Sequence, residues 1–324
     1  MNWVIYCLSL YLRTQNHVGN GRPGWYYLES RQIYLCRSAI LRRFPFIKNI
    51  DKNGFRLSFT LSNCSKKELV QAFREILHEC GQMLLSLPQE KKVEGVWIGD
   101  QFKARADQLA HQLIANRLSE SFPSIPIVSE EDHFSFSKFP NNSYFLIDPI
   151  DGTASFSQGF SGWVTQIALV ENEKPTICGI YAPAFDTFFS AIVGDGAYCN
   201  DQLLPKLEGY IVSSIIDNYP EPNVLVQKLM TSFGIERYLE SGSISLKICR
   251  IADGSADLFC KSMFPRDWDL AAPMVVLSEV NGVITDINGS EIKIGTNIRR
   301  NNGLIAAKSP QIVAKVVDFF NATG

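Results

Sequence analysis

Apolar residues recur at helical spacing in two stretches after residue 64. From Ser65 onward, "KKELVQAFREILHECGQMLLSL" places apolar side chains three and four positions apart, which predicts an amphipathic helix. Ser65 and Glu68 have the spacing of a capping box at its start. The pattern returns at about 104–121, so a second amphipathic helix is expected there.

The rest of the chain alternates apolar runs with turn signals. In the stretch 163–200, turn residues interrupt the apolar runs at 171–175, 182–186 and 194–196, which is typical of a meander of antiparallel strands. Beyond it, the pattern predicts a strand near 210–216, helices near 222–233, 243–254 and 269–280, and a strand near 282–287. This succession predicts a layered α/β fold with a mixed sheet.

Residues 1–60 differ from this body, because they lack a sustained period and hold 11 of the 37 aromatic residues. A folded extension, a flexible tail, or a start codon assigned too far upstream all fit this pattern. We therefore expect an N-terminal extension at 1–60 and one domain at 61–324. The domain divides into two α/β halves at approximately 61–205 and 206–324.

Charge separates the same two regions. The chain as a whole carries −2, but residues 1–60 carry +7 and the remainder carries −9. An acidic body suits cation binding and gives no reason to expect a nucleic acid polymer as partner. A composition of 46% apolar and 20% charged residues is that of an ordinary globular protein.

The cysteines indicate the compartment. Eight are scattered without a C-x-x-C pair, and the four histidines are equally dispersed, so neither a disulfide framework nor a zinc site is expected. Free thiols fit a reducing compartment, and we expect a cytoplasmic protein. The apolar stretch from Val4 to Leu12 is far shorter than the roughly 20 residues that span a bilayer, and it lacks the features of a signal peptide.

The candidate chemistry centres on "YFLIDPIDGTASF", residues 144–156. Pro149 lacks a hydrogen-bond donor, so we expect it to end the strand and to leave Asp148, the Ile150 carbonyl and Asp151 on one side. Oxygen ligands of this kind suit Mg²⁺. The N–H groups of Gly152 and Thr153, with the threonine hydroxyl, suit phosphate. The alternative is an ordinary strand followed by an Asp-Gly turn.

Other acids end neighbouring elements. Glu130 and Glu131 follow the apolar run "IPIV", and ligand sites in α/β sheets form at such strand ends; a solvated acidic loop is the alternative. Asp269 lies near the start of the predicted helix "RDWDLAAPMVVLSEV", with Pro273 expected in its first turn. A plain helix N-cap is the alternative for Asp269.

Together, "SEED", "DPIDGT" and the distant "WDLAA" resemble the inositol monophosphatase superfamily of Mg²⁺-dependent, lithium-sensitive phosphomonoesterases, over roughly residues 65–310. The resemblance implies an αβαβα sandwich of the inositol monophosphatase and fructose-1,6-bisphosphatase type. It also implies two or three Mg²⁺ ions that activate water, a small phosphomonoester as substrate, and a homodimer, for which nothing in the sequence identifies an interface.

The resemblance assigns roles position by position. The implied metal ligands are Glu130, Asp148, the Ile150 carbonyl, Asp151 and Asp269, with Thr153 beside the first ion. The implied catalytic residues are Asp107, which hydrogen-bonds the threonine, together with Thr153 and Glu130. The implied substrate contacts are Asp151, Gly152, Thr153, Lys247 and Asp269.

The substrate is less sharply indicated. "SEED", "EKPTICGIYAP" and "SISLKICRIADGSADLF" look most like the 3'(2'),5'-bisphosphate nucleotidase branch, which converts adenosine 3',5'-bisphosphate to AMP and phosphate. Lys247 would suit a second phosphate, or it is simply a solvated lysine. Ala154 stands where that branch often has lysine, so inositol monophosphate, histidinol phosphate and sugar bisphosphates stay open. A relative that binds metal or nucleotide without catalysis is a further alternative.

Overall fold

The computed structural model describes residues 64–98, 101–131, 140, 142–218, 220–262, 265–295 and 303–323. The predictions made for residues 1–60 lie outside these ranges. Within them, no helix has both the length and the apolar character needed to cross a membrane.

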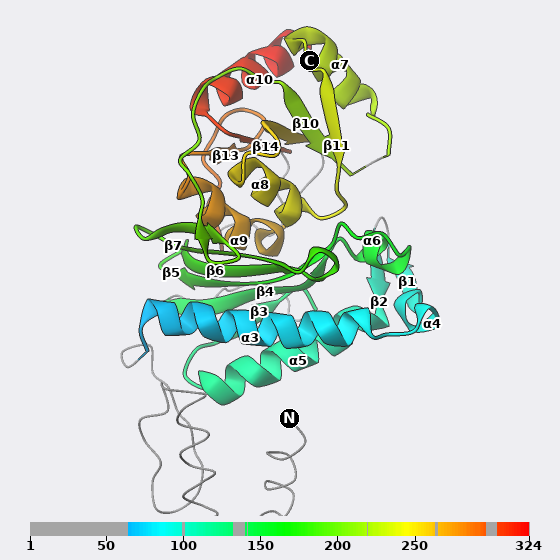
Figure 1. Ribbon diagram of the computed structural model, residues 1–324, viewed down its shortest axis with the longest axis vertical. Coiled ribbons are helices and arrows are strands. Elements are labelled where there is room, and N and C mark those ends of the chain that lie inside the picture. Colours follow the sequence, from blue (N-terminus) through cyan, green and yellow to red (C-terminus); the bar gives the residue numbers. More distant parts are fainter. Residues whose placement is uncertain are drawn as a thin grey trace, which may run out of the picture. The chain divides into compact units, whose positions relative to one another are not determined.

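The described domain consists of five layers (Figure 1), and the predicted αβαβα architecture is confirmed. Two helices cover one face of a seven-stranded sheet, two more separate that sheet from a five-stranded sheet, and a last pair covers the outer face. In layer order the helices are α3 (Lys66–Leu85) and α5 (Arg105–Ser121), then α8 (Ile244–Ala252) and α9 (Asp267–Ser278), then α7 (Val224–Phe233) and α10 (Pro310–Thr323).

The larger sheet has the order β3-β4-β5-β6-β7-β8-β9. β3 and β4 are parallel, and the following neighbours are antiparallel, as the meander predicted. The strands are β3 (Ile127–Ser129), β4 (Ser143–Asp151), β5 (Val164–Glu171), β6 (Lys174–Ala182), β7 (Thr187–Ile192), β8 (Gly196–Cys199) and β9 (Gln202–Leu203).

The smaller sheet is also mixed and has the order β11-β10-β12-β14-β13. β10 is parallel to both β11 and β12, whereas β14 is antiparallel to β12 and β13. The strands are β10 (Ser214–Asp217), β11 (Arg237–Glu240), β12 (Leu258–Lys261), β13 (Val283–Thr285) and β14 (Leu304–Ala307).

Short elements complete the domain. They are the helices α4 (Gln89–Lys92) and α6 (Thr153–Ser157), the 3₁₀ turn η2 (Pro183–Phe185), and a hairpin of β1 (Gly95–Ile98) with β2 (Gln101–Ala104). α6 follows β4 directly.

The first predicted helix is confirmed in detail. The Ser65 hydroxyl accepts from the N–H of Glu68 at 3.2 Å, and the Glu68 carboxylate accepts from the N–H of Ser65 at 2.7 Å. Its apolar face, which includes Phe73 and Leu77, is fully buried against the seven-stranded sheet. The capping box therefore begins α3 where the sequence indicated.

Two predictions about proline were wrong. Pro149 does not end its strand, because β4 continues to Asp151. Pro273 does not lie in the first turn of its helix, because α9 begins at Asp267 and places the proline inside the helix. Both prolines lie next to the acidic cluster, and each lacks the backbone N–H that another residue would offer there.

Candidate metal centre

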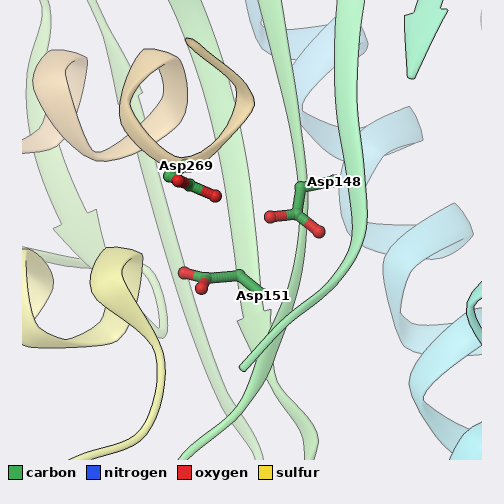
Figure 2. Close-up of side chains that lie close together, drawn as sticks. All are labelled: Asp148, Asp151 and Asp269. Atoms are coloured by element: carbon green, nitrogen blue, oxygen red, sulfur yellow. The ribbon is translucent and has the colours of Figure 1, made fainter. Parts of the chain in front are cut away.

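Three carboxylates from two distant segments meet between the layers. One carboxylate oxygen from each of Asp148, Asp151 and Asp269 lies within 4.8 Å of the other two. Figure 2 shows the three side chains pointing into a common space between β4 and the first turn of α9. Three like charges at this separation repel strongly, so the cluster needs protons or a cation.

A β-bulge places the first two acids on the same side. In the ladder between β4 and β5, Asp148 pairs with Gln166, and Asp151 pairs with Val164. Three steps along β4 are therefore matched by two along β5, so β4 carries one extra residue at this point. In a regular strand, residues three apart face opposite sides; the extra residue brings both carboxylates to one face.

The packing on the two faces of β4 confirms this change. Before the bulge, Tyr144 and Leu146 belong to the core under α8 and α9, whereas Phe145 and Ile147 belong to the core under α3 and α5. After it, the even-numbered Ile150 lies in the core under α3 and α5. The alternation has shifted by one, which turns Asp151 toward α8 and α9.

Asp148 is buried, and the described residues offer a hydrogen-bond donor to only one of its two carboxylate oxygens. Its side chain is 1% exposed, and one oxygen lies 3.4 Å from the Gln166 amide nitrogen. Among the described residues, nothing hydrogen-bonds the other oxygen, Oδ1. Burial and then the charge of Glu130 raise the pKa of Asp148 well above its usual range. A buried oxygen with no donor is the site a cation would satisfy.

Asp151 is held by the N-terminal end of α8. Its Oδ2 accepts from the Ser243 hydroxyl at 2.6 Å and from the Ser245 N–H at 2.7 Å, and its Oδ1 accepts from the Ile244 N–H at 3.2 Å. The helix dipole favours a negative charge at this end. Since a carboxylate has about four lone-pair positions, Oδ1 retains capacity for one more partner.

Asp269 lies in the first turn of α9. Its carboxylate accepts from the Arg266 N–H at 2.6 Å, so it closes the helix start from the third position and is not the N-cap residue considered above. Burial and then the charge of Asp151 raise the pKa of Asp269 to about 7.

Pro273 connects α9 to α8 at this point. A proline has no N–H to donate to the carbonyl four residues earlier, which belongs to Asp269. The Ser245 hydroxyl lies 2.9 Å from that carbonyl and supplies a donor from α8. The two helices that bring Asp151 and Asp269 together are thus joined where the helical hydrogen bond is missing.

Gln166 is a site residue that the sequence reasoning missed. This buried side chain on β5 has its amide nitrogen 2.9 Å from the Trp268 carbonyl, and its amide oxygen lies 2.8 Å from the Ser245 hydroxyl, whose single proton it shares with the Asp269 carbonyl. It therefore links β4 and β5 to both helices. A signal was present, because Gln166 is the polar residue within the apolar run "WVTQIALV".

Thr153 and Asp107 meet as the resemblance implied. The Thr153 hydroxyl lies 3.1 Å from Asp107 Oδ1 and 2.9 Å from the Ile150 carbonyl oxygen. Asp107 is 2% exposed and comes from the first turn of α5. The contact joins α5 to the turn after β4.

Glu130 lies at the end of β3, beside β4. Its N–H donates to the Ile147 carbonyl at 3.3 Å, and among neighbouring charges it has the largest effect on the pKa of Asp148. The parallel pairing of β3 with β4 places their carboxyl ends together, as expected. The N–H of Glu131 instead donates to the Ser129 hydroxyl at 3.2 Å, within its own turn.

Gly152 fits a position that other residues do not. Its φ is +92°, and a Cβ there would lie 3.2 Å from the Ser243 nitrogen and 3.3 Å from the Gly162 oxygen. Both the backbone conformation and the close approach require glycine. Ala154, in the next turn, is exposed.

Lys247 is not a solvated lysine. It is completely buried, and its ammonium group donates to the carbonyls of Ser241 and Gly242 at 2.9 and 3.2 Å. Burial and then the charge of Lys261 lower the pKa of Lys247 to about 7. In this arrangement the ammonium group contacts the backbone beside the acidic cluster.

The ligand chemistry fits a hard divalent cation. The clustered side chains offer carboxylate oxygens, and the Ile150 carbonyl and Thr153 hydroxyl add oxygens nearby. Hard ions such as Mg²⁺ and Ca²⁺ take oxygen ligands of this kind. The orphaned oxygen of Asp148 and the mutual repulsion of the carboxylates both favour such an ion.

Comparisons with known proteins agree with this geometry. A family model described as the inositol monophosphatase family matches residues 66–319. Inositol monophosphatase 1 of Solanum lycopersicum is 30% identical over 223 residues, which cover 65% of this chain and 80% of that protein. The 3'(2'),5'-bisphosphate nucleotidase CysQ of Buchnera aphidicola is 29% identical over 198 residues, covering 60% and 74%.

A solved structure shows the same fold. A staphylococcal inositol monophosphatase-1, described as a LiCl-soaked inhibitory complex, superposes with a TM-score of 0.69 at 22% identity and covers 80% of this chain and 97% of its own. The family match extends over most of the chain and includes every element of the acidic cluster. The chain thus belongs to the inositol monophosphatase family and is a metal-dependent phosphatase that hydrolyses phosphomonoesters.

Proposed function

We propose that this phosphatase is a 3'(2'),5'-bisphosphate nucleotidase that converts adenosine 3',5'-bisphosphate to AMP and phosphate. The observation that carries the proposal is a lysine at the end of β12 whose charge acts on the acidic cluster. Lys261 ends β12, and its positive charge acts to lower the pKa of Asp269. A substrate with a second phosphate would gain from such a cation, whereas an uncharged inositol ring would not.

The relatives include proteins named for both candidate substrates. Proteins named 3'(2'),5'-bisphosphate nucleotidase CysQ from Buchnera aphidicola and Aggregatibacter actinomycetemcomitans are 29% and 28% identical to this chain. Inositol monophosphatases match at similar identity. Identity alone therefore does not discriminate between the two substrates, and the proposal depends on Lys261.

We assign the metal to Mg²⁺, held by Asp148, Asp151, Asp269 and Glu130 with the Ile150 carbonyl. When bound, such ions neutralise phosphate charge and lower the pKa of the attacking water. Asp148 is central to this assignment, because its Oδ1 lacks a hydrogen-bond donor among the described residues.

The protein's own groups orient the reactants. Gly152 and Thr153 lie at the start of α6, where backbone N–H groups have no helical acceptor and can bind phosphate oxygens. The Thr153 hydroxyl, 3.1 Å from Asp107, would pass a proton from water to that carboxylate, and this contact supports the assignment. The water oxygen forms the new bond to phosphorus as the bond between phosphorus and the ester oxygen breaks; one proton of that water passes to Asp107, and the departing alkoxide takes a proton from solvent.

Inositol monophosphate is the second candidate substrate. The presence of Ala154 where the nucleotidase branch often has lysine favours it. A phosphate-release panel with Mg²⁺ separates the candidates, using adenosine 3',5'-bisphosphate, inositol 1-phosphate, fructose 1,6-bisphosphate and histidinol phosphate, each with and without Li⁺.

Lys261→Gln gives the panel a matched test. The variant should lower kcat/KM for the bisphosphate by about tenfold, the scale of one charge-assisted contact. It should change kcat/KM for inositol 1-phosphate less than threefold. Higher kcat/KM for inositol 1-phosphate than for the bisphosphate in the unmodified chain would overturn the nucleotidase proposal.

A further inference from the structure

The buried position of Lys247 makes it structurally unusual. A buried amine is costly unless it is hydrogen-bonded, and here the two acceptors are the backbone carbonyls of Ser241 and Gly242. The ammonium nitrogen also lies 4.9 Å from the centre of the Phe259 ring. The side chain is therefore held by β12 and by the turn that precedes α8.

Helix geometry explains how the side chain reaches that turn. Lys247 is the fourth residue of α8, and helical side chains lean toward the N-terminus. It therefore reaches back over the first turn. A cation near a helix N-terminus opposes the helix dipole, so stabilisation of α8 itself does not account for a lysine here.

The turn is fixed from its other side by close packing. A Cβ on Gly242 would lie 1.9 Å from the Ser155 hydroxyl oxygen, so the turn lies directly against α6. The N–H of Ser243 donates to the Gly162 carbonyl at 2.7 Å. The turn is thus held between Lys247 inside and the segment from Ser155 to Gly162 outside.

The next three residues are those that hold Asp151. The Ser243 hydroxyl and the N–H groups of Ile244 and Ser245 all donate to its carboxylate. Their directions depend on the path of the chain through Ser241 and Gly242. Hydrogen-bond partners of a metal-binding carboxylate typically affect metal affinity by about 10- to 100-fold.

We propose that Lys247 is a positioning residue that fixes the turn at Ser241 and Gly242, so that the start of α8 holds Asp151 in the orientation required for metal binding. The inference rests on the proposed role of Asp151 as a metal ligand. It differs from a direct contact between Lys247 and the substrate, because its effect is exerted on the metal site before any substrate arrives.

The test compares full-length variants in two measurements. Lys247→Met removes the donor and keeps an unbranched apolar side chain in a buried position, and Lys247→Arg keeps a donor. Arg250→Met is the matched control, since it removes a cation from the same helix, where Arg250 pairs with Asp253 at 3.0 Å. Calorimetric titration with Mn²⁺, without substrate, gives metal affinity, and phosphate release gives kcat and KM.

The positioning role predicts that Lys247→Met weakens Mn²⁺ binding by about 10- to 100-fold. It also predicts that kcat falls in parallel, that KM changes less than threefold, and that Lys247→Arg recovers part of the Mn²⁺ affinity. The control should bind Mn²⁺ like the unmodified chain. If Lys247→Met does not fold, as judged by circular dichroism, Lys247→Leu carries the same test, because it also removes the donor and keeps an apolar side chain.

Unchanged Mn²⁺ affinity in folded Lys247→Met would overturn the inference. A rise in KM alone in that variant would instead indicate direct substrate contact. Failure of the proposed function gives a different result. In that case the unmodified chain releases no phosphate from the bisphosphate, while the Mn²⁺ titrations still report on Lys247.

Discussion

The hydroxyl of Thr153 and the carboxylate of Asp107 lie 3.1 Å apart although 46 residues separate them in the chain. The same hydroxyl lies 2.9 Å from the Ile150 carbonyl, so one proton faces two acceptors. An ionised Asp107 attracts this proton and makes the threonine oxygen a better acceptor for a proton from water.

Replacing Thr153 by valine should lower kcat by roughly 10²- to 10⁴-fold, the range typical of an acid–base group. KM should change little, because the backbone N–H groups at this turn are retained. Thr153→Ser keeps the hydroxyl and serves as the control in steady-state phosphate release. A valine variant with normal kcat would remove Thr153 from the proton path.

Asp148→Asn should abolish activity while leaving the metal-free protein at least as stable as the unmodified chain. The side chain is buried beside other carboxylates, which raise its pKa, so a neutral amide relieves repulsion. Thermal unfolding with a chelator present measures the stability, and phosphate release measures the activity. An active Asn variant would refute the assignment of Asp148 as a central metal ligand.

Divalent cations should stabilise the unmodified chain. At a free Mg²⁺ concentration 100 times the dissociation constant, the gain is about 2.7 kcal/mol, which corresponds to a rise in Tm of roughly 5 to 10 °C for a domain of this size. The rise should be smaller in Asp148→Asn. Equal shifts in both proteins would indicate that the ion binds elsewhere.

Ser245→Ala should destabilise the domain by about 1–3 kcal/mol, because the Gln166 amide oxygen and the Asp269 carbonyl lose the single hydroxyl proton that they share. Adding Pro273→Ala restores an N–H that can donate to the Asp269 carbonyl within α9. Chemical denaturation of the two single variants and the double variant should therefore show recovery in the double variant. Strictly additive losses would contradict this link between α8 and α9.

Asp257 should make stability fall in acid. Its carboxylate accepts from the N–H and hydroxyl groups of Ser213 and Ser214, and it pairs with Lys308 at 2.5 Å. Although burial opposes ionisation, these hydrogen bonds lower the pKa of Asp257 to about 2. The ionised form is thus favoured in the folded state.

Because the folded pKa lies below the unfolded value, the stabilisation is complete above about pH 4 and disappears as the pH falls through 2. Its size is about 2 kcal/mol. The difference in unfolding free energy between the unmodified chain and Asp257→Asn should shrink as the pH is lowered from 5 toward 2. A difference that does not change with pH would show that the ionised carboxylate contributes nothing.

The sequence predicted the local features of the site well. These features depend on residues that are close together in the chain, so apolar spacing or a short motif predicts them. They are the helix that begins at Ser65, the helix that carries Asp107 and the acids of β4. Four-residue strands such as β11, β12 and β14 are too short for such a pattern. The strand predicted near 210–216 lies at Ser214–Asp217, so the sequence located it only approximately.

The donors around Asp151 could not be predicted in this way. Ser243 lies 92 residues further along the chain, and its contact depends on how α8 packs on the seven-stranded sheet. Lys247 illustrates the same point, because a lysine in a short amphipathic segment reads as solvated until the packing around α8 is known. Gln166 alone carried a local sign, a polar residue within an apolar run.

The bulge in β4 means that two carboxylates three positions apart face the same way. Deleting either Pro149 or Ile150 would leave every acid of the site in the chain. It would also keep both carboxylates toward α8 and α9, because residues two apart face the same side of a regular strand, but it would remove the bulge and with it the backbone path that brings the Ile150 carbonyl to the Thr153 hydroxyl. The extra residue between the two aspartates therefore sets the path of the backbone beside them, and not the side to which their carboxylates point.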